Sequence, residues 1–204
     1  MQAARRLLCT AACALQCLAA AHAATVTVTD STGQPLADAV VYFEPVRGAK
    51  PAPSAAKPAM IEQIKRRFVP ALTVVQTGTP VSFPNRDSVR HHVYSFSPTK
   101  SFELKLYAGT PSEPVVFDKP GTVVLGCNIH DQMVAYVHVV DTPFFAKTDV
   151  QGVGAVPGVP VGNYRLKVWH SALGIARPVP EKAVVVKGPD TGFAFTLDTS
   201  APAR

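Results

Sequence analysis

The stretch GTVVLGCNIHDQMVAYVHVV, residues 121–140, decides how the middle of this chain folds. Its two ends, GTVVLGC and VAYVHVV, are Val-rich runs of strand length, and the residues between them are mostly polar. We therefore predict two neighbouring strands joined by a tight loop. Cys127, His130 and Met133 are spaced three residues apart on this loop, which brings a thiol, an imidazole and a thioether together.

These three side chains are donors that suit copper. One Cys thiolate, two His imidazoles and a weak axial Met form the trigonal site of blue-copper electron-transfer proteins. Zinc sites favour further Cys, His or carboxylate ligands over a thioether. Covalent haem attachment needs C-x-x-C-H, and this chain has C-x-x-H. The spacing therefore favours copper over zinc and haem.

Two interpretations without a metal stay open on the residues alone. Cys127 and Met133 could be core residues, because free Cys and Met are often buried. Cys127 could instead be a nucleophile with His130 or His91 as its base. No acid that would orient such a base stands in a recognisable motif.

A copper site of this kind needs a second imidazole. FPNRDSVRHHVYSF, residues 83–96, supplies His91 and His92 at the start of a predicted strand. Strand alternation places His91 and Val93 on one face, and His92 and Tyr94 on the other. Only one of the two His residues can therefore face the Cys-containing loop.

FDKPGTVVLGCNIHDQM together with NRDSVRHHV resembles the cupredoxins, the small blue-copper proteins such as plastocyanin and azurin. The C-x-x-H-x-x-M spacing is closest to amicyanin, and Asn85, His91 and Val93 match the N-x(5)-H-x-V pattern of the upstream ligand. The resemblance covers residues about 68–140. It implies a Greek-key sandwich that binds one type 1 copper ion through His91, Cys127, His130 and Met133.

Two positions depart from the cupredoxin pattern. His92 stands where cupredoxins usually carry an Asn that links the two ligand loops, so both His91 and His92 stay open as the ligand, and the family spacing favours His91. The strand before Cys127 ends Val124-Leu125-Gly126 and lacks the aromatic residue that is common there, and Gly126 can let the backbone approach closely. His92 and Asn128 are candidates for side chains that surround the metal without binding it, and the Asn128 amide could hold the loop or tune the sulfur.

The first residues have the form of a secretory signal peptide. A short basic region precedes the apolar run LLCTAACALQCLAAA, and Ala21-His22-Ala23 has the small-x-small form of a cleavage site. We predict cleavage after Ala23, export to the periplasm and no later membrane span. Cleavage leaves Cys127 as the single cysteine; a lipoprotein anchored at Cys13 or Cys17 is the alternative.

Short Val-, Thr- and aromatic-rich runs separated by Gly and Pro recur along the chain, which is typical of an all-β sandwich. The one plausible helical turn is MIEQIKRRF, residues 60–68. We expect its KRR run to be a solvated face, with a basic docking patch as the alternative. We also expect His138, between two Val residues of a strand, to lie at the surface.

The outer segments resemble carboxypeptidase regulatory-like (transthyretin-like) sandwich domains. TVTVTDSTGQPLADAVVYFEP is similar to the opening strands of that family, and AKTDVQGVGAVPGVPVGNYRLKVWH to a later part. The resemblance implies one small β-sandwich interrupted by, or joined to, the cupredoxin segment; tandem domains are the alternative. The predicted layout is a signal peptide at 1–23, a first sandwich segment with a Pro/Ala-rich linker at 24–59, a cupredoxin domain at 60–142, and the rest of the sandwich with a C-terminal tail at 143–204.

The whole chain resembles the cupredoxin-containing proteins named methylamine utilisation proteins. This resemblance implies an electron carrier rather than an enzyme, with a c-type cytochrome or a periplasmic dehydrogenase as partner. A protein that binds or stores copper, or an extracellular binding module without redox turnover, is the alternative. The formal charge of +6, which falls to +4 without Arg5 and Arg6, suggests an anionic protein partner or envelope surface rather than nucleic acid, and the alternative is that these charges only keep the protein in solution.

Overall fold

A computed structural model describes residues 23–46, 57–188 and 190–200. The predicted signal peptide, except Ala23, and most of the Pro/Ala-rich linker lie outside these ranges. The prediction of an all-β protein is confirmed, because the described residues contain strands and a single 3₁₀ turn, η1 (Ser171–Leu173). No helix in this part of the chain is long and apolar enough to cross a membrane.

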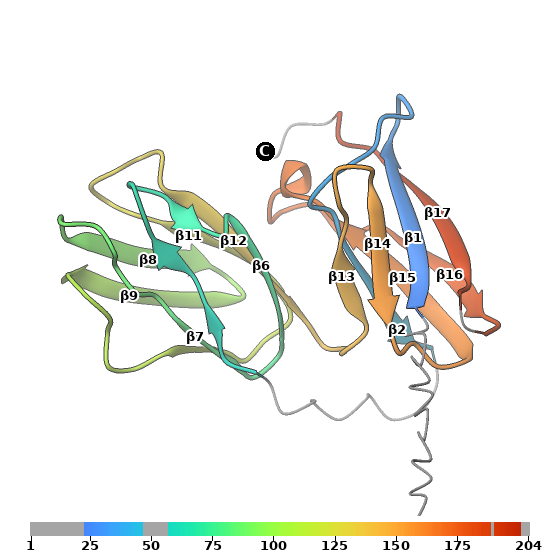
Figure 1. Ribbon diagram of the computed structural model, residues 1–204, viewed down its shortest axis with the longest axis horizontal. Coiled ribbons are helices and arrows are strands. Elements are labelled where there is room, and N and C mark those ends of the chain that lie inside the picture. Colours follow the sequence, from blue (N-terminus) through green and yellow to red (C-terminus); the bar gives the residue numbers. More distant parts are fainter. Residues whose placement is uncertain (1–22, 47–56, 189, 201–204) are drawn as a thin grey trace, which may run out of the picture.

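Strands from both ends of the chain together form one β-sandwich, here called the outer sandwich (Figure 1). In its first sheet, β1 (Ala23–Asp30) is antiparallel to β14 (Val153–Pro157) and parallel to β17 (Gly192–Leu197). Its second sheet has the order β13-β2-β15-β16, with bounds Phe145–Lys147, Val40–Pro45, Gly162–Trp169 and Glu181–Val186.

Residues 59–140 form a second β unit, here called the central unit, between β2 and β13 of the outer sandwich. Its main sheet has the order β6-β12-β11-β8-β9, with bounds Leu72–Gln76, Val134–Val140, Gly121–Gly126, His91–Ser97 and Lys100–Tyr107. A smaller sheet has the order β10-β7-β3, with bounds Val115–Phe117, Thr79–Ser82 and Ala59–Met60. Side chains of both sheets share one core, which includes Val81, Val93, Phe117, Leu125 and Val137.

The predicted helical turn at residues 60–68 is wrong, because this segment is a β-hairpin. β4 (Glu62–Gln63) pairs antiparallel with β5 (Phe68–Val69), and Lys65-Arg66 form the two-residue turn between them. The buried Gln63 side chain amide donates to the carbonyl of Phe83 at 3.1 Å. That tertiary bond holds the chain extended where local helix propensity is weak.

The expectation that His138 lies at the surface is also wrong, because β12 is buried on both faces. Ala135, Val137 and Val139 face the core of the central unit, whereas the alternate residues face the outer sandwich. On that second face the ring of His138 stacks on Trp169 of β15, with ring centroids 4.8 Å apart and planes inclined by 18°. Contacts between the two units therefore cover this histidine.

Candidate metal centre

The predicted ligands come from two neighbouring strands of the main sheet and the loop beside them. His91 begins β8, and Cys127 directly follows β11. β8 and β11 pair antiparallel at Tyr94 and Gly126. This pairing brings the start of β8, at His91, close to the end of β11, just before Cys127. β11 and β12 pair up to Gly126 and Val134, so residues 127–133 form the predicted loop between strands.

Three of the predicted ligands converge on one point. Sγ of Cys127 lies 3.9 Å from Nδ1 of His91 and 3.9 Å from Nδ1 of His130. The three atoms all lie within 4.8 Å of one another. Cys127 and His91 are buried, with 3% and 0% of their surface exposed, and His130 is half-buried. Two imidazoles and one thiol thus surround a common point, and His130 is the most exposed of the three residues.

The spacing of these atoms fits a bound transition metal. With zinc-like bonds of about 2.3 Å to sulfur and about 2.0 Å to nitrogen at an angle of about 120–130°, the sulfur and nitrogen atoms would lie about 3.7–3.9 Å apart. The donor set of one thiol and two imidazoles is the one that type 1 copper uses. The residues present therefore fit a copper ion.

Met133, the predicted axial ligand, is 1% exposed and lies in the same buried cluster as Cys127. Its backbone N–H donates to the carbonyl of His130 at 2.9 Å, which closes the loop into a turn. The loop geometry thus keeps Met133 on the core side of the loop.

The structure separates the two candidate histidines. His91 points to Cys127, whereas Nε2 of His92 lies 2.9 Å from Oε1 of Glu103 on β9. The ring of His92 packs against Tyr94, so it lies on the opposite face of β8. His92 therefore makes no link to the Cys127 loop. Asn128 is exposed, and its side chain forms no hydrogen bond with any residue that the structure describes.

Asp87 is the residue of this site that the sequence patterns did not identify. Its Oδ2 lies 2.8 Å from Nε2 of His91, so the carboxylate holds the ring nitrogen that faces away from Cys127. The Asp87 carboxylate also accepts the backbone N–H groups of Lys65 and Arg66 at 2.6 and 2.8 Å. The position of Asp87 four residues before His91 is the one sequence signal that could have indicated it.

The electrostatics of Asp87 follow from these contacts. Burial alone would raise the pKa of the Asp87 carboxyl group. Hydrogen bonds from the Arg66 amide, the His91 ring and the Lys65 amide outweigh burial and hold the pKa below its usual value. The carboxylate is therefore ionised at neutral pH, and it places the ring proton of His91 on Nε2, which leaves the Nδ1 lone pair directed at Cys127.

Asn85, the first residue of the upstream pattern, holds the loop that carries His91. Its side chain amide donates to the carbonyls of Val89 and Tyr107 at 2.8 and 3.0 Å, and its Oδ1 accepts the N–H of Asp87 at 2.9 Å. The loop between Asn85 and His91 is thus fixed by its own side chains and by β9.

Gly126 makes room for an aromatic ring of the neighbouring strand, on the sheet face that also carries His92. A Cβ atom at this position would lie 2.8 Å from Cζ of Tyr94, closer than side chains tolerate. The sequence lacks an aromatic residue directly before Cys127, and the Tyr94 ring of β8 packs over that position.

Comparisons with known proteins return solved structures only. No protein-family model matches the chain, and no curated protein sequence matches it. A purple cupredoxin from Nitrosopumilus maritimus is 23% identical, with a TM-score of 0.36, over 40% of this chain and 99% of its own. A point mutant of amicyanin in its reduced Cu(I) form is 17% identical, with a TM-score of 0.38, over 49% of this chain and 98% of its own.

A third similar structure is the copper-containing nitrite reductase from Thermus scotoductus. It is 21% identical, with a TM-score of 0.38, over 56% of this chain and 28% of its own. These identities and scores are too low to assign the chain to a family. The geometry around Cys127 is the basis for a functional proposal.

Proposed function

We propose that this protein is a periplasmic type 1 copper protein of the cupredoxin type that transfers single electrons between redox proteins. One observation carries the proposal: the sulfur of the buried Cys127 lies 3.9 Å from Nδ1 of both His91 and His130. These three residues, with the Met133 thioether as a further donor, would hold one copper ion. Bound copper supplies a one-electron couple between Cu(II) and Cu(I).

The protein contributes rigidity and controlled access. His91 is buried, begins a paired strand and is held at its far nitrogen by Asp87, so its ring has little freedom to move. Cys127 follows a strand that is paired on both sides. His130 is half-buried on the loop, and the resemblance to cupredoxins suggests the outer edge of its ring as the route for electrons. A c-type cytochrome or a periplasmic dehydrogenase is the expected partner.

Two rival functions can be separated from electron transfer. The first rival is a cysteine enzyme, which would use Cys127 as nucleophile, His91 as base and Asp87 as the acid that orients the base. The sequence motifs did not indicate this acid. However, Cys127 is only 3% exposed, so a substrate could hardly reach its sulfur. The imidazole of His130 lies as close to this sulfur as that of His91, and a cysteine enzyme would have no use for it. A copper-storage protein would use the same ligands but exchange the ion readily.

The deciding experiment is the visible and electron paramagnetic resonance spectra of protein from Ala24 onward loaded with Cu(II), beside Cys127→Ser. We expect an intense thiolate-to-copper absorption band and narrow hyperfine splitting, both lost in the variant. A pale protein whose copper signal survives Cys127→Ser would refute the proposal. Rapid alkylation of Cys127 by iodoacetamide in metal-free protein would favour the enzyme, and rapid removal of copper by a chelator would favour storage.

A further inference from the structure

The hairpin tip beside the candidate metal centre has a backbone conformation that its residues disfavour. Ile64 and Arg67 exchange two backbone hydrogen bonds of 3.0 and 3.1 Å, and the two residues between them form the turn. Lys65 and Arg66 both have positive φ angles, 52° and 56°. Such turns favour Asn-Gly, because a left-handed backbone crowds the Cβ of other residues. Two consecutive cationic residues here therefore reduce stability.

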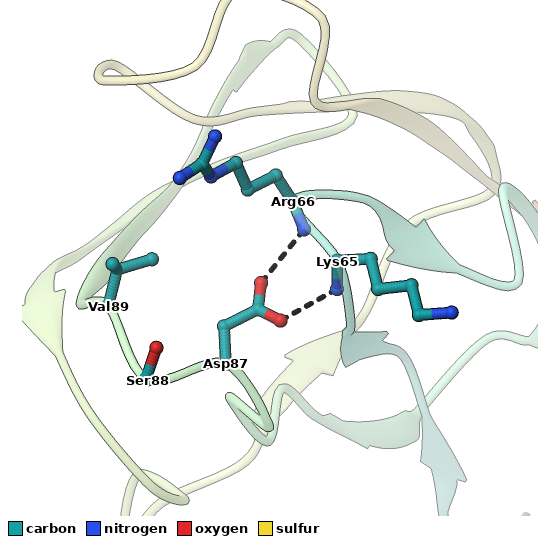
Figure 2. A pocket seen from close by; sticks show the side chains of 5 residues that line it. All are labelled: Lys65, Arg66, Asp87, Ser88 and Val89. Atoms are coloured by element: carbon teal, nitrogen blue, oxygen red, sulfur yellow. Dashed lines mark hydrogen bonds between the residues drawn. The ribbon is translucent and has the colours of Figure 1, made fainter.

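Tertiary contacts hold this turn in place. Figure 2 shows the Asp87 carboxylate below the turn, where it accepts the N–H groups of Lys65 and Arg66. Glu62, at the base of the hairpin, pairs with Arg86 at 2.8 Å, on the loop that leads to His91. The same Asp87 carboxylate contacts His91, so the turn is fixed relative to the candidate ligand.

The turn and the loop before His91 display cations that form no ion pair within the described part of the chain. The side chains of Lys65, Arg66, Arg67 and Arg90 are exposed, and none of them forms an ion pair with an acid that the structure describes. We call these four residues the cationic rim. Figure 2 shows Arg66 extended toward Val89 across a hollow of about 310 Å³, whereas Lys65 points the opposite way.

The acids nearby do not neutralise the rim. Glu62 is paired with Arg86, and Asp87 faces inward to the turn amides and His91. Arg90 directly precedes His91, and the Arg66 amide lies 2.8 Å from the carboxylate that contacts His91. Positive charge is therefore concentrated beside His91, on the side of the site where Asp87 lies.

We propose that the cationic rim docks an acidic redox protein next to the copper ligands. The proposal rests on the proposed electron-transfer function and names the chemistry of its partner. Clustered carboxylates on the partner would find unpaired cations here, and charge complementarity of this kind increases the rate of encounter and weakens with salt. The strained turn holds the backbone of two of these cations against the carboxylate that contacts His91.

The first test measures binding without copper. Oxidised flavodoxin, a strongly acidic one-electron flavoprotein, is titrated at low salt into ¹⁵N-labelled metal-free protein. We expect amide shifts confined to residues 64–67 and 86–91, which disappear at high salt and in Arg66→Glu/Arg90→Glu. The control Lys182→Glu/Lys187→Glu makes the same charge change on exposed lysines of the outer sandwich and should bind as wild type. Absent shifts, or shifts centred elsewhere, would overturn the proposal.

The second test measures electron transfer to copper-loaded protein. Reduced flavodoxin should react faster at low salt, and Arg66→Glu/Arg90→Glu should slow it roughly tenfold or more. Reduced mitochondrial cytochrome c, a basic protein, should not be slowed by this variant. Equal slowing with both proteins would overturn the docking role. Binding at the rim in protein that forms no blue-copper site would contradict the proposed function but leave the acidic-partner surface supported.

A third variant tests the link between strain and docking. Lys65→Asn/Arg66→Gly places the favoured pair in the turn and removes two charges. We expect a higher denaturation midpoint together with weaker flavodoxin binding. Stronger binding, or unchanged binding, would overturn the assignment of these two cations. Displacement of flavodoxin by millimolar phosphate at constant ionic strength would also overturn this assignment, because it would indicate a site for small anions rather than for a protein.

Discussion

Oδ2 of Asp87 lies 2.8 Å from Nε2 of His91, and Nδ1 on the same ring faces Sγ of Cys127 at 3.9 Å. The negative charge of the Asp87 carboxylate therefore acts through the His91 ring on the nitrogen that would bind copper. A carboxylate behind a ligand histidine increases the basicity of the ligand and favours the more highly charged metal ion.

We therefore predict that Asp87→Asn raises the reduction potential of the copper-loaded protein. Loss of the negative charge stabilises Cu(I) relative to Cu(II), and a tenfold change in the equilibrium would shift the potential by about 60 mV. Protein-film voltammetry measures this shift. Asp118→Asn is the control, because Asp118 carries the same charge but is exposed and pairs with Lys100. Equal shifts in both variants, or a fall in potential, would contradict the prediction.

The two adjacent histidines should behave differently when each is truncated. His91→Ala removes one of the two imidazoles next to Cys127, so the intense visible band should vanish. His92→Ala removes an ion-pair contact with the half-exposed Glu103 on the other face of β8, so the band should remain, with a loss of stability of at most about 1 kcal/mol. Visible absorption and copper stoichiometry test both variants. A colourless His92→Ala that is folded would assign the ligand role to His92.

Met133→Leu should keep the blue colour and raise the reduction potential. The thioether is a weak donor that stabilises Cu(II), whereas a hydrocarbon of similar volume donates nothing. Because Met133 is 1% exposed and the exchange conserves volume, we expect a loss of less than about 1.5 kcal/mol in unfolding free energy. Leu125→Met in the same buried cluster is the matched control. A potential shift no larger than that of the control would show that Met133 only fills the core.

His138 should make the protein less stable in mild acid. Burial, aided by the positive charge of Lys167, lowers the pKa of His138 from 6.5 to about 4, and its nearest polar contact is Thr122 Oγ1, 3.0 Å from Nδ1. The unfolded chain binds a proton below pH 6.5 that the folded protein binds only near pH 4. Stability is therefore lost as pH falls between these values, by about 2 kcal/mol at pH 5.

Urea denaturation of metal-free protein at pH 7 and pH 5 measures this loss, because without copper the ligand histidines are not linked to a metal. His138→Phe keeps a ring on Trp169 but cannot titrate, so the difference between the two pH values should shrink by about 2 kcal/mol in this variant. An unchanged difference would show that other groups cause the acid sensitivity.

The strands on both sides of the ligand loop and the spacing of the candidate ligands could be predicted from the sequence alone. The alternation in TVTVT correctly places Val26 and Val28 on the buried face of β1. The Val-rich runs on both sides of the Cys127 loop form β11 and β12, as predicted. These features depend on side chains two or three residues apart, whose positions a strand or a tight loop determines directly. The all-β class and the convergence of Cys127 and His130 therefore follow from short-range pattern.

Contacts between distant segments decided the rest. Local propensity predicts a helical turn around Lys65-Arg66, but this segment is a hairpin. Hydrogen bonds with Asp87 and Phe83, from another part of the chain, hold it extended. His138 reads as exposed, and Trp169 of the outer sandwich buries it. Asp87 has no motif of its own, and its role arises because one carboxylate reaches both a strained turn and His91. Such contacts depend on how separate units pack, and residue spacing in the sequence carries no record of that packing.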